Sequence, residues 1–231
     1  MAHRRIWIAV ALLAVATAVS ACSGGTAQAH SITVTFVRHG QSQSNEKEVI
    51  DAEVPGPDLT SEGRRQAQQL AQQLARNHYD AVYASTMVRT QQTASPLAKE
   101  LGKPVEIVAG LQEIDAGWFQ GTPLARKPST YMVAPQAWLL GDRQETIPGS
   151  INGNQFNDQF TAAMQRIYES GHRKPVVFSH NASIVYWTLL NVTNPPDTLA
   201  DPSLPNGGRV VITGNPTNGW QLADWNGTSG F

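Results

Sequence analysis

A cation and an imidazole stand next to each other in the segment Arg38-His39-Gly40, directly after the apolar run from Ile32 to Val37. A guanidinium presents a planar set of N–H donors that matches the oxygens of a phosphate group. A neutral imidazole can act as a nucleophile or as a base. The tripeptide alone is equally compatible with phosphate chemistry and with a surface loop that happens to hold Arg and His. Other motifs in the sequence are needed to choose between these two interpretations.

The place of this pair at the end of an expected strand favours a binding site. Residues 32–37 are mostly β-branched, which predicts a buried strand. In open α/β sheets, ligands bind at the carboxyl ends of the strands, where Arg38 and His39 would lie. Gly40 lets the backbone turn close to a ligand, and Asn45 adds a short polar side chain within reach.

Five segments together resemble one known family. The segment from Arg38 through Gln41 to Asn45 resembles the signature of the histidine phosphatase superfamily, the phosphoglycerate-mutase-like enzymes. Four further segments resemble motifs of that family in the same order: residues 59–67, 85–94, 111–121 and 176–180. One short motif is weak evidence, but five in order over roughly residues 32–218 make a specific match.

The resemblance implies a catalytic set of five residues, which are Arg38, His39, Arg89, Glu113 and His180. The two arginines would hold the phosphoryl oxygens, and their charge would lower the pKa of His39 and keep its ring neutral. His39 would attack phosphorus and form a phosphohistidine, while Glu113 would give a proton to the leaving alkoxide. His180 would donate a hydrogen bond to the phosphoryl oxygens in the transition state.

The substrate-binding residues expected beside this set are Gln41, Asn45 and Asn181. Asp115 lies two residues after Glu113 and competes with it for the part of proton donor. The sequence contains no group of Asp and His residues with metal-ligand spacing. We therefore predict that the enzyme needs no metal and no other cofactor.

Strands alternate with helices along the chain, which predicts a three-layer α/β/α sandwich around a mostly parallel central sheet. The resemblance implies the same phosphoglycerate-mutase-like fold, in a single domain over residues 32–231. The predicted strands span residues 32–37, 80–84, 105–108 and 176–179, with a terminal hairpin over 209–225. The predicted helices span residues 60–76, 87–101 and 156–170, and a last one ends near residue 190. Residues 117–155 contain four prolines and no clear periodicity, which indicates a lid or binding loop.

The first 31 residues have the composition of an export segment. A basic start is followed by an apolar run, residues 6–19, that is too short and too rich in alanine to predict a membrane span. Val19-Ser20-Ala21-Cys22 then matches a bacterial lipoprotein cleavage site, and Cys22 is the only cysteine of the chain. An ordinary signal peptide with a chance cysteine is the alternative.

We therefore expect residues 1–21 to be a lipoprotein signal peptide and residues 22–31 to be a flexible tether that carries lipid on Cys22. This places the protein at the extracytoplasmic face of the cell membrane. Removing residues 1–21 changes the net charge from −1 to −3, because 15 Lys and Arg then face 18 Asp and Glu. A chain without basic excess is not drawn to anionic lipid, so the lipid itself must anchor it, and its charge argues against nucleic acid as a partner.

These observations predict a phosphate monoester hydrolase that acts on a phosphorylated small molecule through a phosphohistidine. A phosphoglycerate-type mutase is a second hypothesis, which the export signal disfavours because glycolytic intermediates are cytosolic. A lipoprotein that binds a phosphorylated ligand without catalysis is a third, and the intact His39 and Glu113 argue against it.

Overall fold

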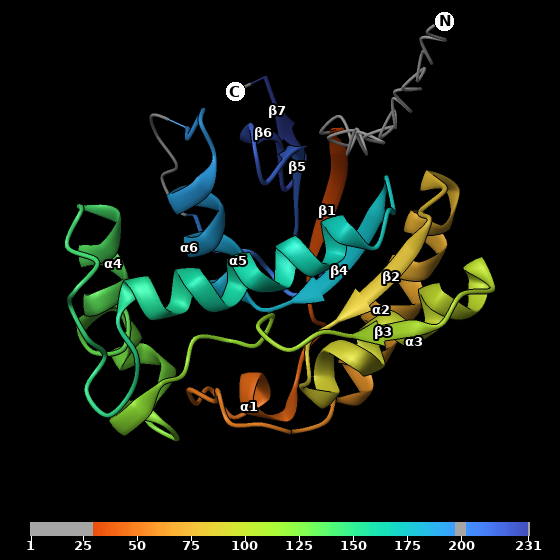
Figure 1. The fold of residues 1–231 in the computed structure, drawn as a ribbon. Helices are drawn as coiled ribbons and strands as arrows, with labels where there is room; N and C mark the ends of the chain where they lie inside the picture. The colour runs from red at the N-terminus through yellow and green to blue at the C-terminus, as the bar shows by residue number, and fades with distance from the viewer. Residues whose placement is uncertain (1–29, 197–201, 231) are drawn as a thin grey trace, which may run out of the picture.

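The computed structural model describes residues 30–196 and 202–230 (Figure 1). Cys22, the predicted signal peptide and most of the predicted tether lie outside the described residues. Within these ranges the chain forms one seven-stranded sheet, with the spatial order β3-β2-β4-β1-β5-β6-β7. The strands are β1 (Ile32–Arg38), β2 (Ala81–Ala84), β3 (Val105–Ile107), β4 (Pro175–Ser179), β5 (Arg209–Asn215), β6 (Gly219–Trp225) and β7 (Thr228–Ser229).

Helices cover both faces of this sheet, with α2 and α3 on one face and α5 and α6 on the other (Figure 1). The α-helices are α1 (Gln43–Glu46), α2 (Ser61–Leu74), α3 (Val88–Leu101), α4 (Val133–Leu139), α5 (Gly153–Glu169) and α6 (Asn181–Asn191). Three short 3₁₀ segments are described as well, η1 (Ala75–Asn77), η2 (Gly117–Phe119) and η3 (Leu124–Ser129). The predicted three-layer α/β/α architecture is confirmed.

The sheet is mixed, with a parallel half and an antiparallel half. The pairs β3–β2, β2–β4 and β4–β1 are parallel, because helical crossovers connect these strands. The pairs β1–β5, β5–β6 and β6–β7 are antiparallel, and a tight turn joins β5 to β6 as the predicted hairpin requires. The prediction of a mostly parallel sheet therefore holds for the strands β3, β2, β4 and β1, whereas β5, β6 and β7 are antiparallel to their neighbours.

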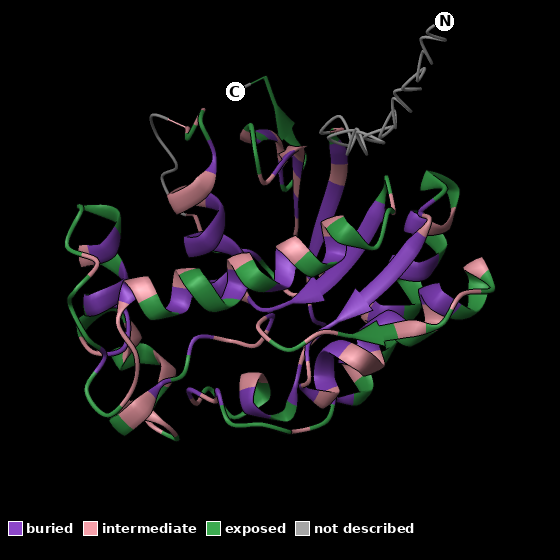
Figure 2. Ribbon diagram, in the orientation of Figure 1, coloured by how far each residue is buried: buried purple, intermediate pink, exposed green. Residues whose placement is uncertain are grey.

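Side chains of the central strands alternate between the two faces of the sheet and build two separate hydrophobic cores. Figure 2 shows these strands as mostly buried. On β1, Phe36 packs against Phe160 of α5 and Trp187 of α6, with ring centroids 5.8 Å apart in both pairs. The next residue, Val37, belongs to the opposite core beneath α2 and α3. Side chains of successive strand residues point to opposite faces, so a strand covered on both sides must be apolar at nearly every position.

The region from residue 117 to 155, predicted to be irregular, contains more helix than expected. It holds η2, η3 and the helix α4, and α5 begins within it at Gly153, three residues before the predicted start. Pro135 lies in the first turn of α4, where proline is tolerated. Trp138 anchors the helix by stacking on Phe156 at a centroid distance of 5.6 Å. Packing on the core therefore forms a helix where the sequence pattern shows none.

The chain contacts the domain before the first strand begins. The His30 ring stacks on Tyr168 with centroids 4.8 Å apart, so the end of the predicted tether lies against α5. Over residues 30–196 and 202–230, none of the helices combines the length and apolar character that crossing a bilayer requires.

Candidate active site

Two neighbouring parallel strands bring two histidines together at one edge of the sheet. Arg38 pairs with Ser179 in the β1–β4 register, so His39 and His180 follow at the same level. Their ring centroids lie 5.2 Å apart at an angle of 61°. Both residues are buried, with exposed fractions of 4% for His39 and 0% for His180. The register of two strands thus positions both imidazoles that the sequence singled out.

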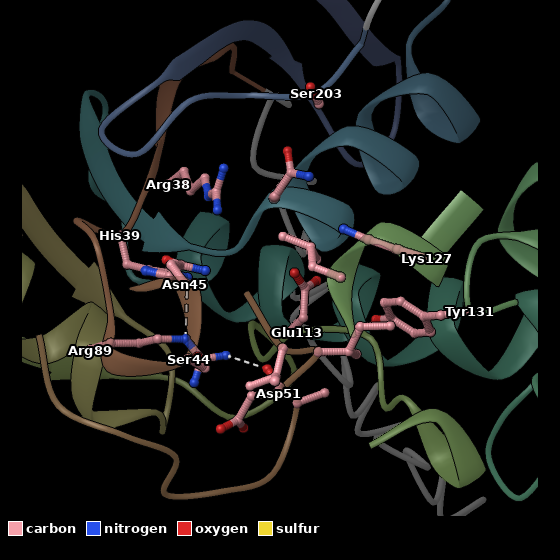
Figure 3. A pocket seen from close by; sticks show the side chains of 15 residues that line it. Arg38, His39, Ser44, Asn45, Asp51, Arg89, Glu113, Lys127, Tyr131 and Ser203 are labelled. Carbon is pink, nitrogen blue, oxygen red and sulfur yellow. Dashed lines mark hydrogen bonds between the residues drawn. The ribbon is translucent and has the colours of Figure 1, made fainter. Parts of the chain in front are cut away.

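The hydrogen bonds of His39 define its tautomer. Nδ1 lies 2.7 Å from the carbonyl oxygen of Gly40, which can only accept, so Nδ1 carries the proton. Nε2 therefore keeps its lone pair and accepts a hydrogen bond from Nε of Arg89 at 3.2 Å (Figure 3). Burial, followed by the charges of Arg89 and Arg38, lowers the pKa of His39 well below its ordinary value. The ring is neutral, and its basic nitrogen faces the guanidinium.

His180 lies behind His39 and does not line the cavity described below. Its Nε2 is 2.9 Å from the hydroxyl of Ser85, and its Nδ1 is buried without a hydrogen-bond partner among the described residues. Burial, then the charge of Arg89, lowers the pKa of His180 well below its ordinary value. A buried nitrogen without a partner is costly, so Nδ1 is a candidate contact for a ligand.

Two buried arginines bring positive charge to the same place. Arg89 lies in the first turn of α3, is 2% exposed, and donates through Nη2 to the carbonyl of Asp51 at 3.1 Å. Arg38 donates through Nη1 to the carbonyl of Leu204. Burial lowers the pKa of both arginines, and the charge of Glu113 partly opposes that effect. Nε of Arg38 and Nη1 of Arg89 have no hydrogen-bond partner among the described residues, which leaves donors for an anion.

A cavity of about 260 Å³ opens in front of His39 (Figure 3). It brings together six of the eight predicted site residues, which are Arg38, His39, Asn45, Arg89, Glu113 and Asn181. His180 and Gln41 do not line it. The side chain of Gln41 points elsewhere, because its Oε1 accepts a hydrogen bond from the Thr60 hydroxyl at 2.7 Å. Gln41 therefore connects the turn after β1 to the start of α2.

Glu113 enters the cavity from the segment after β3 and caps the N-terminus of α6. Its Oε1 accepts hydrogen bonds from the backbone N–H of Ser183 at 2.9 Å and from the Ser183 hydroxyl at 3.0 Å. Its Oε2 accepts from the N–H of Ala182 at 3.2 Å. Helix ends leave such N–H groups unpaired, and His180, the N-cap residue, makes no side-chain cap.

The competing carboxylate, Asp115, is exposed and does not line the cavity. Its side chain accepts a hydrogen bond from the N–H of Gly117 at 3.1 Å. Of these two carboxylates, Glu113 is the one that lines the cavity with His39 and the two arginines, and its part as proton donor stays a prediction.

Asn206 is a site residue that sequence reasoning missed. Its Nδ2 donates to the backbone carbonyl of His39 at 3.0 Å and to Oδ1 of Asn45 at 3.1 Å. Oδ1 of Asn45 also accepts from the N–H of Ser42 at 3.1 Å, so the Asn45 amide group is oriented with its NH₂ free for a ligand.

Other residues around the site were also missed, among them Ser85, Asp51, Lys127 and Tyr131. Ser85 lies within the motif at residues 85–94, so its position carried a signal. Lys127 and Tyr131 lie in the segment 117–155, where no pattern distinguished them.

The two depressed histidine pKa values predict a loss of stability in acid. Below a pH of about 6.5 the unfolded chain binds protons at these histidines while the folded protein does not, so stability falls as the pH drops. We expect the melting temperature in phosphate-free buffer to fall between pH 7 and pH 5. The fall should be shallower in His180→Asn than in the wild type, whatever the stability of the variant at pH 7.

The exposed His78 supplies the control for this experiment, and His78→Asn should follow the wild-type curve. Parallel curves for His180→Asn and the wild type would contradict the assignment of a neutral, buried His180.

No group of three or more His, Cys, Asp or Glu residues within residues 30–196 and 202–230 could hold a metal ion. The chemistry that the described side chains offer is that of a phosphate-binding pocket with a neutral imidazole at its base.

Comparison with known proteins identifies the family. The sequence matches the histidine phosphatase superfamily (branch 1) over residues 34–228, and the chain belongs to this superfamily. Its members are phosphatases or mutases, and the match supports an enzyme of this general kind. The resemblance seen in the motifs of the sequence is confirmed.

The sequence is also similar to individual proteins. The PE-PGRS family protein PE_PGRS11 of Mycobacterium tuberculosis is 42% identical over 221 residues, which cover 88% of this chain. The chain spans only 38% of the length of that relative. Putative phosphoserine phosphatase 2 of Hydrogenobacter thermophilus is 23% identical over 149 residues, or 64% of this chain and 73% of the relative.

A solved structure shows the same fold. A mycobacterial glucosyl-3-phosphoglycerate phosphatase has a TM-score of 0.69 to this chain at 20% identity. The match covers 86% of this chain and 100% of the other.

Proposed function

We propose that the protein hydrolyses phosphate monoesters through a phosphohistidine formed on Nε2 of His39. The observation that carries this proposal is the protonation pattern of the ring. Nδ1 donates to the carbonyl of Gly40, and Nε2 keeps its lone pair beside the guanidinium of Arg89. In-line attack on phosphorus requires such a lone pair next to the cations that hold the phosphoryl group.

In the first step, Nε2 attacks phosphorus, an N–P bond forms, and the P–O bond to the leaving group breaks. Arg38 and Arg89 hold the phosphoryl oxygens and offset the charge that repels a nucleophile. Glu113, protonated at this stage, transfers its proton to the leaving oxygen. His180 lies against His39 and donates to a phosphoryl oxygen.

In the second step, water attacks the phosphohistidine. Glu113 is now a carboxylate and takes a proton from the attacking water. The N–P bond breaks, inorganic phosphate leaves, and His39 returns to its neutral form. The same carboxyl group thus serves as acid and then as base.

The size of the cavity supports a small substrate. At about 260 Å³ it lies below the range of roughly 300–1,000 Å³ that is usual for drug-sized ligands. Two of the three similar proteins described above, a putative phosphoserine phosphatase and a glucosyl-3-phosphoglycerate phosphatase, also have names that refer to phosphorylated small molecules.

Turnover of p-nitrophenyl phosphate by the purified protein tests the proposal. We expect release of inorganic phosphate, inhibition by vanadate, and no change in rate after dialysis against EDTA, because two arginines and two histidines supply the charge and the donors. Binding without turnover would indicate a non-catalytic protein. Transfer of phosphate from a bisphosphate primer to 3-phosphoglycerate, faster than its release, would indicate a mutase. Loss of activity in EDTA, restored by a divalent ion, would contradict metal independence.

The location at the extracytoplasmic face of the cell membrane is also part of the proposal, and the motif Val19-Ser20-Ala21-Cys22 supports it. A single acyl chain binds a membrane only marginally, so stable anchoring needs more than one chain on Cys22. We expect Cys22→Ser to be left unprocessed or released from the membrane fraction, as seen by fractionation and intact mass. Equal retention of a correctly cleaved Cys22→Ser protein would point to another anchor.

A further inference from the structure

Ser85 carries a buried hydroxyl that the mechanism proposed above does not use. It follows β2 as His180 follows β4, because Ala84 pairs with Phe178 in the parallel register of these two strands. Its backbone N–H donates to the carbonyl of Phe178 at 3.2 Å, and both Ser85 and His180 are 0% exposed. Oγ of Ser85 lies 2.9 Å from Nε2 of His180. A third strand end therefore contributes a side chain next to the two histidines.

The hydroxyl of Ser85 has three hydrogen-bond partners, which are Nε2 of His180, the N–H of Met87 at 3.2 Å and the hydroxyl of Thr90 at 2.9 Å. The N–H of Met87 can only donate, so Ser85 accepts from it. The single proton of the Ser85 hydroxyl then goes either to Nε2 of His180 or to Oγ1 of Thr90. Two arrangements of protons are therefore compatible with the same atomic positions.

Both arrangements satisfy the two hydroxyl groups. In the first, Thr90 donates to Ser85, and Ser85 donates to Nε2 of His180. The carbonyl of Met87, which lies 2.8 Å from Oγ1 of Thr90, still accepts the N–H of Thr90 at 3.1 Å. In the second, Thr90 donates to that carbonyl, Ser85 donates to Thr90, and the N–H at Nε2 of His180 donates to Ser85.

The two arrangements differ at Nδ1 of His180, which has no hydrogen-bond partner among the described residues. Burial and the charge of Arg89 lower the pKa of His180, so its ring is neutral and carries one proton. That proton is on Nδ1 in the first arrangement and on Nε2 in the second. Only the first lets Nδ1 donate to a phosphoryl oxygen, because in the second a lone pair would face that oxygen.

We propose that Ser85 is a positioning residue for His180. Its hydroxyl donates to Nε2, keeps the proton of the ring on Nδ1, and so makes His180 a hydrogen-bond donor to a phosphoryl oxygen. Ser85 does not line the cavity and acts on the substrate only through this ring. The inference rests on the proposed hydrolysis of phosphate monoesters and assigns how one residue of that reaction is prepared for it.

Ser85→Ala tests this role in the steady state. We expect kcat with p-nitrophenyl phosphate to fall at least about tenfold and KM to change less than about threefold, because the hydrogen bond from His180 strengthens as charge develops on the phosphoryl oxygens. Ser170→Ala is the control and should keep the wild-type kcat. Oγ of Ser170 lies 2.8 Å from Nδ1 of His172, and this serine–histidine pair precedes β4, at the opposite end of the strand from His180. A wild-type kcat in Ser85→Ala would overturn the inference.

A double-mutant cycle shows whether Ser85 acts through His180. His180→Asn removes Nε2, the atom that Ser85 contacts. Adding Ser85→Ala to His180→Asn should therefore change kcat less than about threefold, against at least about tenfold in the wild-type background. Equal losses in the two backgrounds would contradict the inference, because Ser85 would then act through Met87 or Thr90.

The tautomer of His180 can be observed directly by NMR of the imidazole nitrogens in protein with isotope-labelled histidine. The spectra are recorded with saturating inorganic phosphate, and the signals of His180 are identified by their absence in His180→Asn. We expect a protonated Nδ1 and an unprotonated Nε2 in the wild type, and loss of this single tautomer in Ser85→Ala. A proton on Nε2 in the wild type would refute the inference, because Ser85 would then be the acceptor.

These outcomes separate the inference from the proposed function. If the wild type hydrolyses p-nitrophenyl phosphate and Ser85→Ala matches it, only the inference fails. If the wild type hydrolyses no phosphate monoester, the proposed function fails, and the NMR spectra with bound phosphate still decide whether Ser85 sets the tautomer of His180.

Discussion

His39→Asn should lower kcat at least ~10³-fold with every phosphate monoester, because the covalent route depends on the lone pair of Nε2. Asparagine has no nucleophilic nitrogen, whereas its amide can still donate a hydrogen bond in this buried position. Steady-state rates measure the loss. Acid-quench experiments on the wild type should also detect bound phosphate that is labile in acid and stable in base, and His39→Asn should show none.

His78→Asn is the matched control for this substitution. His78 is exposed and has a positive φ of 54°, a conformation that asparagine tolerates, so the variant should keep the wild-type rate. Thermal unfolding should show that His39→Asn is folded at pH 7. Near wild-type activity in a folded His39→Asn protein would show that another residue is the nucleophile.

Glu113→Gln should produce a loss that depends on the leaving group. An alkyl phosphate leaves as a strongly basic alkoxide and needs a proton in the transition state, whereas p-nitrophenolate leaves almost unaided. We expect a loss of at least about 10²-fold with an alkyl phosphate and of less than about tenfold with p-nitrophenyl phosphate. Single-turnover rates are required, so that cleavage of the P–O bond is measured rather than hydrolysis of the phosphohistidine.

The structure shows why the two losses of rate, with the alkyl phosphate and with p-nitrophenyl phosphate, must be compared as a ratio. Glu113 also caps α6, and a glutamine could present an NH₂ group to the N–H of Ala182, which now donates to Oε2 at 3.2 Å. Loss of that hydrogen bond costs about 1–3 kcal/mol and would affect both substrates alike. Asp115→Asn is the control. A leaving-group-dependent loss in Asp115→Asn, and none in Glu113→Gln, would assign the acid to the other carboxylate.

The sequence by itself determined the features that depend on neighbouring residues. The β-branched run predicts β1, and the chain leaves it at Arg38 as expected. Thr60 caps α2 by accepting the N–H of Gly63 at 3.0 Å, and Gly102 ends α3 with a φ of 63°. These signals act over a few positions, so they can be interpreted without any knowledge of the rest of the fold.

The order of the motifs also determined the family, because each motif combines a strand end or helix start with a polar residue of defined type. That is why six of the eight predicted site residues line one cavity. Gln41 illustrates the limit of this reasoning. It lies within the first motif, but its side chain bonds to Thr60 on α2, and only the packing of α2 against the turn after β1 decides this.

The tertiary structure alone decided how groups distant in sequence complete the site. Asn206 donates a hydrogen bond to the carbonyl of His39, which lies 167 residues earlier in the chain. Glu113 caps α6 by accepting the N–H of Ser183, which lies 70 residues later. Lys127 reaches the cavity because η3 and its neighbours cover the site, in a segment without periodicity. Such contacts arise from burial and from the need to pair buried polar groups, and no local sequence window contains both partners.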